Sequence, residues 1–76
     1  MTIQEIASEI TGRTPYGEFH LSAYDTSEGM EWTCEIIGLK WPDVQSLVCE
    51  EGHKTPEEAA NAAYQEWKQL LEVDAE

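Results

Sequence analysis

Four side chains in this sequence have the chemistry to bind a soft metal ion or to support nucleophilic catalysis: His20, Cys34, Cys49 and His53. Only Cys49 and His53 are separated by a spacing that is common among zinc ligands. The strand patterns described below place His20 on one face of a sheet and Cys34 on the other, so the four side chains cannot meet at one tetrahedral ion. We therefore expect no metal site and no cofactor.

Catalysis would need further features that the sequence lacks. A cysteine nucleophile requires a base beside it, and a carboxyl group that exchanges protons requires a pKa raised by burial. Cys34 lies at an apolar position typical of a buried structural thiol. The acidic residues fall mostly on faces expected to be in water, and no glycine-rich phosphate-binding loop is present. The sequence predicts no catalytic residues and a protein that is not an enzyme.

Net charge is the strongest feature of the composition. Sixteen acidic residues are opposed by four basic ones, which gives a formal net charge of -12 at pH 7. Nucleic acids and anionic membranes would repel such a surface, because binding to them depends on Lys and Arg. A basic protein partner would be attracted. High solubility is the simpler explanation of the same charge, and the sequence leaves both interpretations open.

The length of 76 residues predicts a single domain over 1–76, and a hydrophobic content of 41% is enough for a small core. The N-terminal segment has neither the basic nor the apolar region of a signal peptide. No stretch approaches the roughly 18 apolar residues of a membrane span. We expect a cytoplasmic protein whose two cysteines are free thiols.

Two segments show the 3.6-residue periodicity of amphipathic helices. The first starts with a capping box formed by Thr2 and Glu5 and is expected to end at Gly12. The second starts with Thr55 as the cap and Pro56 in the first turn. Their apolar stripes consist of Ile3, Ile6, Ala7 and Ile10 in the first helix and of Ala60, Ala63, Trp67, Leu70 and Leu71 in the second.

Between the helices the apolar residues alternate with polar ones, which is typical of half-buried strands. We expect strands over 17–25, 30–36 and 44–50, with a turn at 25–29 and a loop over 38–43. The facing of the third strand is the least clearly patterned. This order predicts an α+β fold, a three-stranded antiparallel sheet with the N- and C-terminal helices packed on one face.

The other face of such a sheet is exposed to solvent. The residues expected on it are Glu18, His20, Tyr24, Glu31, Glu35 and Glu50. Trp41, in the loop, is a further candidate for partner binding, because aromatic residues are frequent hot spots of interfaces.

The order of elements resembles that of double-stranded-RNA-binding domains over most of the chain. In that family the start of the last helix carries lysines that bind phosphate, whereas this chain has Thr55-Pro56-Glu57-Glu58-Ala59. The resemblance implies the topology but not RNA binding. A local resemblance, from Pro42-Asp43-Val44 through Cys49-Glu50-Glu51-Gly52 to the same helix start, is to the HicB-type antitoxin domain. That family neutralises a small basic RNA-cleaving toxin; this chain has an additional helix before its first strand.

Small size, acidity and the lack of catalytic residues are similar in kind to phage-encoded inhibitors of host defence, among them anti-CRISPR and anti-restriction proteins. Several of these present carboxylates where the target binds nucleic-acid phosphates. Our first hypothesis is a non-enzymatic acidic inhibitor, monomer or dimer, that covers the basic nucleic-acid-binding surface of a protein partner. Glu18, Glu31 and Glu35 would make the ionic contacts, and Tyr24 or Trp41 would be apolar anchors. The alternative is a HicB-like antitoxin module that masks a basic RNase toxin.

Overall fold

The structure, a computed structural model, describes residues 1–40 and 43–74. It contains a helix, three strands and a second helix, which confirms the expected α+β order. The elements are α1 (Ile3–Arg13), β1 (Glu18–Thr26), β2 (Gly29–Lys40), β3 (Asp43–His53) and α2 (Pro56–Asp74).

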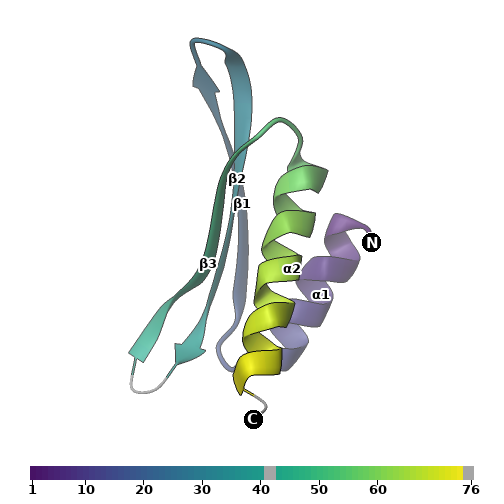
Figure 1. The fold of residues 1–76 in the computed structure, drawn as a ribbon, viewed down its shortest axis with the longest axis vertical. Helices are drawn as coiled ribbons and strands as arrows, with labels where there is room; N and C mark the ends of the chain where they lie inside the picture. The colour runs from purple at the N-terminus through teal and green to yellow at the C-terminus, as the bar shows by residue number, and fades with distance from the viewer. Residues whose placement is uncertain (41–42, 75–76) are drawn as a thin grey trace.

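The molecule has two layers, a sheet and a pair of helices (Figure 1). The strand order is β1-β2-β3, and both neighbouring pairs are antiparallel. Helix α2 contacts all three strands, and α1 packs against α2 and β1. Both helices therefore cover the same face of the sheet, as the sequence predicts, and the opposite face carries no helix.

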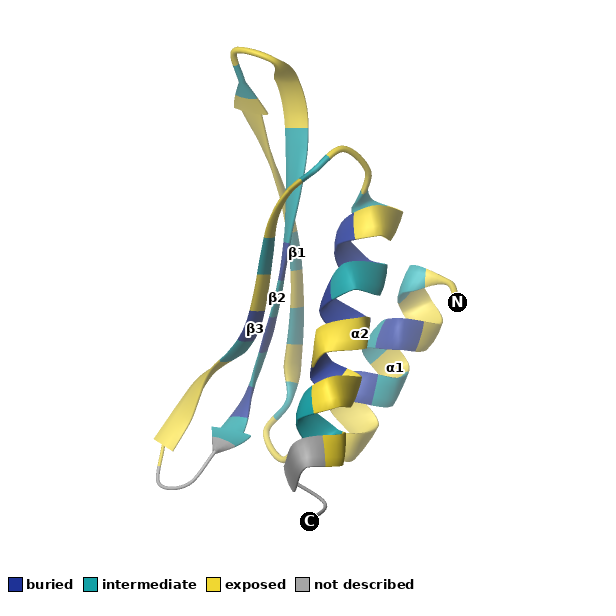
Figure 2. Cartoon of the chain, viewed as in Figure 1, coloured by how far each residue is buried: buried dark blue, intermediate teal, exposed yellow. Residues whose placement is uncertain are grey.

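The core lies between the two layers, where Figure 2 shows the buried positions of the helices and of the strands facing them. Small side chains on α2 let its backbone approach the sheet, and Trp67 is the largest fully buried side chain. Phe19 and Leu21 of β1 are partly buried against the same cluster. The buried members are Ile6, Ile10, Cys34, Ile36, Val48, Ala59, Ala60, Ala63, Tyr64 and Trp67.

The helix starts follow the sequence signals. The Thr2 hydroxyl accepts a hydrogen bond from the Glu5 backbone N–H at 3.1 Å, and the Glu5 carboxylate accepts one from the Thr2 N–H at 3.0 Å. In α2 the Thr55 hydroxyl accepts from the Glu58 N–H at 3.1 Å. Each cap satisfies a backbone donor that has no partner within the helix.

The predicted end of the first helix at Gly12 is wrong. Helix α1 continues to Arg13, and Thr14 ends it in an extended conformation (φ -110°, ψ 120°). Thr14 is held there because its hydroxyl accepts a 2.9 Å hydrogen bond from the buried Trp67 Nε1. Pro15 disfavours a helical conformation at Thr14, and the contact with α2 holds the end of α1 in place.

The predicted loop over 38–43 is also too long, because β2 continues to Lys40 and β3 begins at Asp43. Gly38 allows β2 to continue by passing closely under the α1–β1 connection. A Cβ atom at Gly38 would lie 2.3 Å from Thr14 Cγ2 and 3.0 Å from Leu47 Cδ1. The next residue, Leu39, donates its backbone N–H to the Pro15 carbonyl at 2.8 Å.

The predicted facing of Glu50 is wrong. Val48 fills the core from β3, and strand alternation puts Glu50 on the same side. Its cross-strand partner is the fully buried Cys34, and cross-strand partners share a face. Glu50 therefore faces the helices. The register with β2 is irregular on both sides of this region, once next to Leu47 and once at Gly52, whose φ is +76°.

Candidate protein-interaction face

The helix-free face of the sheet carries five of the six strand residues predicted for it. Cross-strand register places His20 opposite Glu35 and Tyr24 opposite Glu31, and Glu18 lies on the same side at the start of β1. The alternate residues Phe19 and Leu21 of β1 and Trp32, Cys34 and Ile36 of β2 face the core. We call this surface the outer face and define it by Glu18, His20, Tyr24, Glu31, Glu35, Ser46, Cys49 and Glu51.

The β1 part of the outer face is open to solvent. The side chains of Glu18 and His20 are 63% and 53% exposed, and Glu18 Oε1 lies 3.7 Å from His20 Nε2. This contact is an ion pair only when the imidazole is protonated. Tyr24 is 41% exposed. A partner can reach all three of these side chains.

Glu31 is less available than the sequence suggests. Its Oε2 lies 3.3 Å from the Lys54 ammonium, and its Oε1 accepts a 3.4 Å hydrogen bond from the Tyr24 hydroxyl. The Glu31 side chain is only 18% exposed. Because its charge is already paired, Glu31 has less to gain from a basic partner than Glu18 or Glu35.

Sequence reasoning missed the β3 residues of the outer face. The Ser46 hydroxyl donates to Glu35 Oε2 at 3.0 Å, and Cys49 Sγ lies 3.7 Å from Glu51 Oε1. Desolvation, followed by the negative charges of Glu51 and Glu35, raises the pKa of the Cys49 thiol. Val48 was the available signal for Cys49 and Glu51, because a core residue at 48 places 49 and 51 on the other face. Ser46 reaches the outer face through the register shift next to Leu47, which the sequence pattern does not show.

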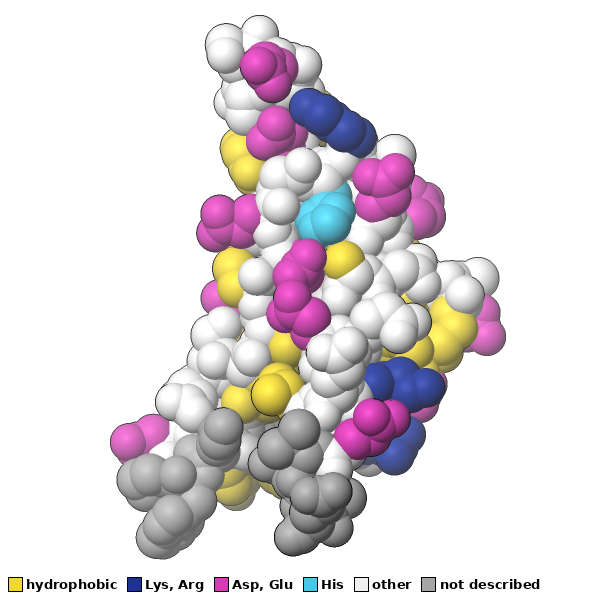
Figure 3. All heavy atoms as spheres, viewed as in Figure 1, with side chains coloured by type: hydrophobic (Ala, Val, Ile, Leu, Met, Phe, Trp, Pro, Cys, Tyr) yellow, Lys and Arg dark blue, Asp and Glu magenta, His cyan; other side chains and the backbone are white. Residues whose placement is uncertain are grey.

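Acidic residues are not confined to this face. Figure 3 shows them over both layers of the molecule, on the sheet as well as on the helices. Among the described cations, Arg13 pairs with Glu9 at 3.1 Å, and Lys68 lies over the Tyr64 ring at 5.4 Å. What distinguishes the outer face is its helix-free surface, on which carboxylates from three strands are presented together.

A separate group of titratable residues lies at the seam between β3 and α2, which faces the viewer in Figure 3. His53 Nε2 is 3.1 Å from Glu50 Oε1. A hydrogen bond with Glu66 of α2 lowers the pKa of Glu50, and the same bond raises the pKa of Glu66. The two shifts have opposite directions because the pair couples a carboxyl group of β3 to one of α2.

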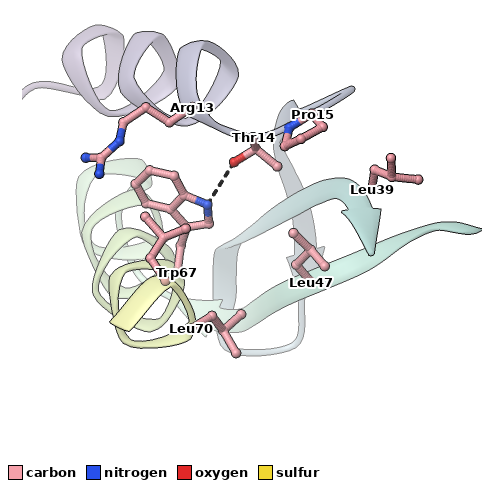
Figure 4. A pocket seen from close by; sticks show the side chains of 8 residues that line it. Arg13, Thr14, Pro15, Leu39, Leu47, Trp67 and Leu70 are labelled. Carbon is pink, nitrogen blue, oxygen red and sulfur yellow. Dashed lines mark hydrogen bonds between the residues drawn. The ribbon is translucent and has the colours of Figure 1, made fainter. Parts of the chain in front are cut away.

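An apolar cavity of about 140 Å³ lies at the other end of the helix layer (Figure 4). The Thr14 hydroxyl that lines it accepts the Trp67 hydrogen bond, and the Arg13 side chain is paired with Glu9. Its lining has no carboxylate, thiol or imidazole group, so it offers no nucleophile or general base. The lining consists of Arg13, Thr14, Pro15, Leu39, Leu47, Trp67, Leu70 and Leu71.

The metal-binding and nucleophilic residues considered first do not come together. Burial raises the pKa of the Cys34 thiol to about 12, so this thiol is protonated at neutral pH. Over 1–40 and 43–74, no three His, Cys, Asp or Glu side chains gather closely enough to hold a metal ion. Trp41, the predicted anchor in the loop, lies outside the described residues.

Comparisons with protein-family models, with curated proteins and with solved structures found no match for this chain. In the part of the chain that the structure describes, neither helix has the length and apolar character needed to cross a membrane.

Proposed function

We propose that this protein is a non-enzymatic acidic inhibitor that binds the basic nucleic-acid-binding surface of a protein partner through its outer face. This activity would suit a phage-type inhibitor of host defence that acts in the cytoplasm. The observation that carries the proposal is the set of carboxylates on a helix-free sheet face in a chain of net charge -12.

The expected mechanism has two stages. Long-range attraction between the acidic body and a basic surface first raises the association rate. Glu18 and Glu35 then pair with Lys or Arg of the partner, while Tyr24 supplies an exposed aromatic contact beside them. Glu31 supports this contact indirectly, because it holds the Tyr24 hydroxyl at 3.4 Å.

A HicB-like antitoxin module remains a second candidate. The capped passage from β3 into α2, with the Thr55 hydroxyl bonded to the Glu58 N–H, is the observation that favours it. The partner would then be a small basic RNase. The identity of the partner separates the two candidate functions. An antitoxin of this kind would bind an RNase and abolish its RNA cleavage.

The test uses the immobilised chain and a lysate of a bacterial host, with elution by duplex DNA or by salt. We expect the main bound protein to be a nucleic-acid-binding protein. Duplex DNA should displace it, and raising NaCl from about 0.05 to 0.5 M should release it, because added salt shortens the Debye length. A partner that resists both treatments would contradict the proposal.

Matched charge variants test whether the outer face itself is used. Glu18→Lys with Glu35→Lys should slow association by at least about tenfold. Glu57→Lys with Glu72→Lys, on α2, is the control; each replacement adds two positive charges, so either pair changes the net charge from -12 to -8. Equal loss in both double variants would show that net charge alone attracts the partner and would remove the outer face from the mechanism.

A further inference from the structure

The free edge of β1 is a regular, unprotected strand edge. β1 is the first strand in the order β1-β2-β3, so only one of its sides is paired. Its nine residues, Glu18–Thr26, pair with β2 in one continuous register. Within the described chain, no backbone hydrogen bond beyond those of the sheet involves these nine residues. Their free N–H and C=O groups are a template for one more strand.

The other edge of the sheet, β3, is protected against pairing with another chain, whereas β1 is not. β3 pairs with β2 through two register irregularities, and it carries the adjacent acids Glu50 and Glu51. Bulges and charges are the usual devices that stop an edge from pairing with another chain. β1 has neither bulge, proline nor lysine, and its acids, Glu18 and Asp25, lie near its two ends.

The sequence of β1 is complementary to itself in one antiparallel arrangement. A two-fold axis at Ser22 pairs all nine residues and keeps both helix layers on the same side of the sheet. Glu18 then faces Thr26, and Asp25 faces Phe19, so no carboxylate directly opposes another. His20 faces Tyr24 on the outer side, and the apolar Leu21 faces Ala23 on the helix side.

Apolar surface at this edge supports the same arrangement. Phe19 and Leu21 are only partly buried by the helices of their own chain, and Ala23 is exposed. The turn end of the β1–β2 hairpin also extends beyond the helices (Figure 2). A second copy would cover these side chains as well as the backbone edge.

We propose that the occupant of this edge is a second copy of the chain, which joins the two sheets into one of six strands. The two outer faces then form one continuous acidic surface. This inference goes beyond the proposed function and stands on different observations. Its salt dependence is also opposite, because salt screens the repulsion between two bodies of charge -12 and so promotes pairing.

The first test is sedimentation velocity of the purified chain alone, at concentrations up to about 1 mM in about 0.05 and 0.5 M NaCl. We expect a monomer–dimer equilibrium whose association constant rises at least about tenfold at the higher salt. A purely monomeric chain at the highest concentration and salt would overturn the inference. It would leave the proposed function untouched, since that function requires only the outer face of one copy.

The second test places the contact on β1. Ser22→Glu puts two like charges face to face on the axis and should abolish the dimer, whereas Ser22→Thr should keep it. Ser46→Glu makes the same charge change at an exposed position of β3 and should leave the dimer unchanged. Circular dichroism confirms that each variant is folded. Loss of the dimer in Ser46→Glu but not in Ser22→Glu would assign the contact to β3 and contradict the inference.

A thiol version tests the register. In a Cys49→Ser background, Ser22→Cys should give a covalent dimer on mild oxidation, because the introduced thiol faces its own counterpart across the two-fold axis. Ser46→Cys in the same background is the control and should give no covalent dimer. Cys34 does not interfere, because it is fully buried. Equal crosslinking of both variants would indicate random collision and would count against the register.

Discussion

The two faces of the sheet carry one cysteine each, and the two thiols show how differently the same residue is used. Cys34 faces the helices, has no exposed surface, and has a thiol pKa raised to about 12 by burial. Cys49 is exposed on the outer face, where desolvation and then nearby carboxylates raise its thiol pKa. Burial removes the Cys34 thiol from solvent, whereas the Cys49 thiol lies at the surface beside carboxylates.

This difference limits what a sequence reveals about each face. A core face is specified by apolar residues that must all meet, so its members are recognised by periodicity. The outer face consists of the residues that do not enter the core, and its electrostatic properties depend on which charged groups are paired with one another. Lys54 beside Glu31 is the example, because it neutralises a carboxylate that the strand pattern alone presents as free.

Thiol labelling should show the largest difference between the faces. At pH 8, a thiol with a pKa of about 12 has roughly one part in ten thousand as thiolate. We expect Ellman's reagent to titrate one thiol per native chain, Cys49, and two in denaturant. Two thiols reacting at similar rates in the native chain would break the distinction drawn between the faces.

Large-to-small substitutions should divide the faces by stability. Trp67→Ala removes the largest buried side chain and the donor to Thr14, so we expect a loss of about 3–5 kcal/mol in the free energy of unfolding. Tyr24→Ala on the outer face should cost less than about 1 kcal/mol. Urea denaturation followed by circular dichroism measures both. Comparable losses would mean that the outer face is part of the folding core.

Two glycine substitutions compare a closely packed backbone position with an open one. Gly38→Ala places a Cβ atom 2.3 Å from Thr14 Cγ2 and should lower the free energy of unfolding by about 1–3 kcal/mol. Gly12→Ala is the control, because nothing lies within 4 Å of a Cβ atom there and the residue is helical. It should stabilise the protein by about 0.5–1 kcal/mol. A neutral Gly38→Ala would show that the α1–β1 connection moves aside without cost.

The smallest effect is expected at the seam between β3 and α2. The raised pKa of Glu66 means that protonation of this group favours the folded state, so stability falls as pH rises through that pKa. The lowered pKa of Glu50 acts in the opposite sense, and stability falls as pH drops through it. Stability should therefore pass through a shallow maximum between the two folded-state values.

Glu66→Gln separates these two contributions. Its amide donates to Glu50 at every pH, so we expect the loss above the Glu66 pKa to disappear, with a gain below about 1 kcal/mol at pH 7 because the site is solvent-screened. Urea denaturation between about pH 3 and 7 measures the profile. An unchanged profile in Glu66→Gln would assign the pH dependence to other carboxylates.

The strand and helix assignments succeeded where one local signal was sufficient. Thr2 with Glu5 and Thr55 with Pro56 specify helix starts through neighbouring backbone groups, and residues 18–26 and 30–36 alternate regularly. Gly12 misled because Pro15, a second local signal, disfavours a helical residue at Thr14 and so allows the helix to run on to Arg13. The hydrogen bond from Trp67 then holds Thr14 in place. Glu50 was placed on the wrong face because the pattern of its strand contains too few apolar residues to fix the facing.

The sequence by itself determined the net charge, the order of elements and the stripes that become the core, because composition and periodicity are local properties. Only the tertiary structure decided which carboxylates are free, that Cys49 is exposed beside carboxylates and which strand edge is open. Those properties depend on contacts between residues distant in the chain, such as Lys54 with Glu31 and Ser46 with Glu35. Packing brings these partners together, and no spacing along the chain encodes the distance between them.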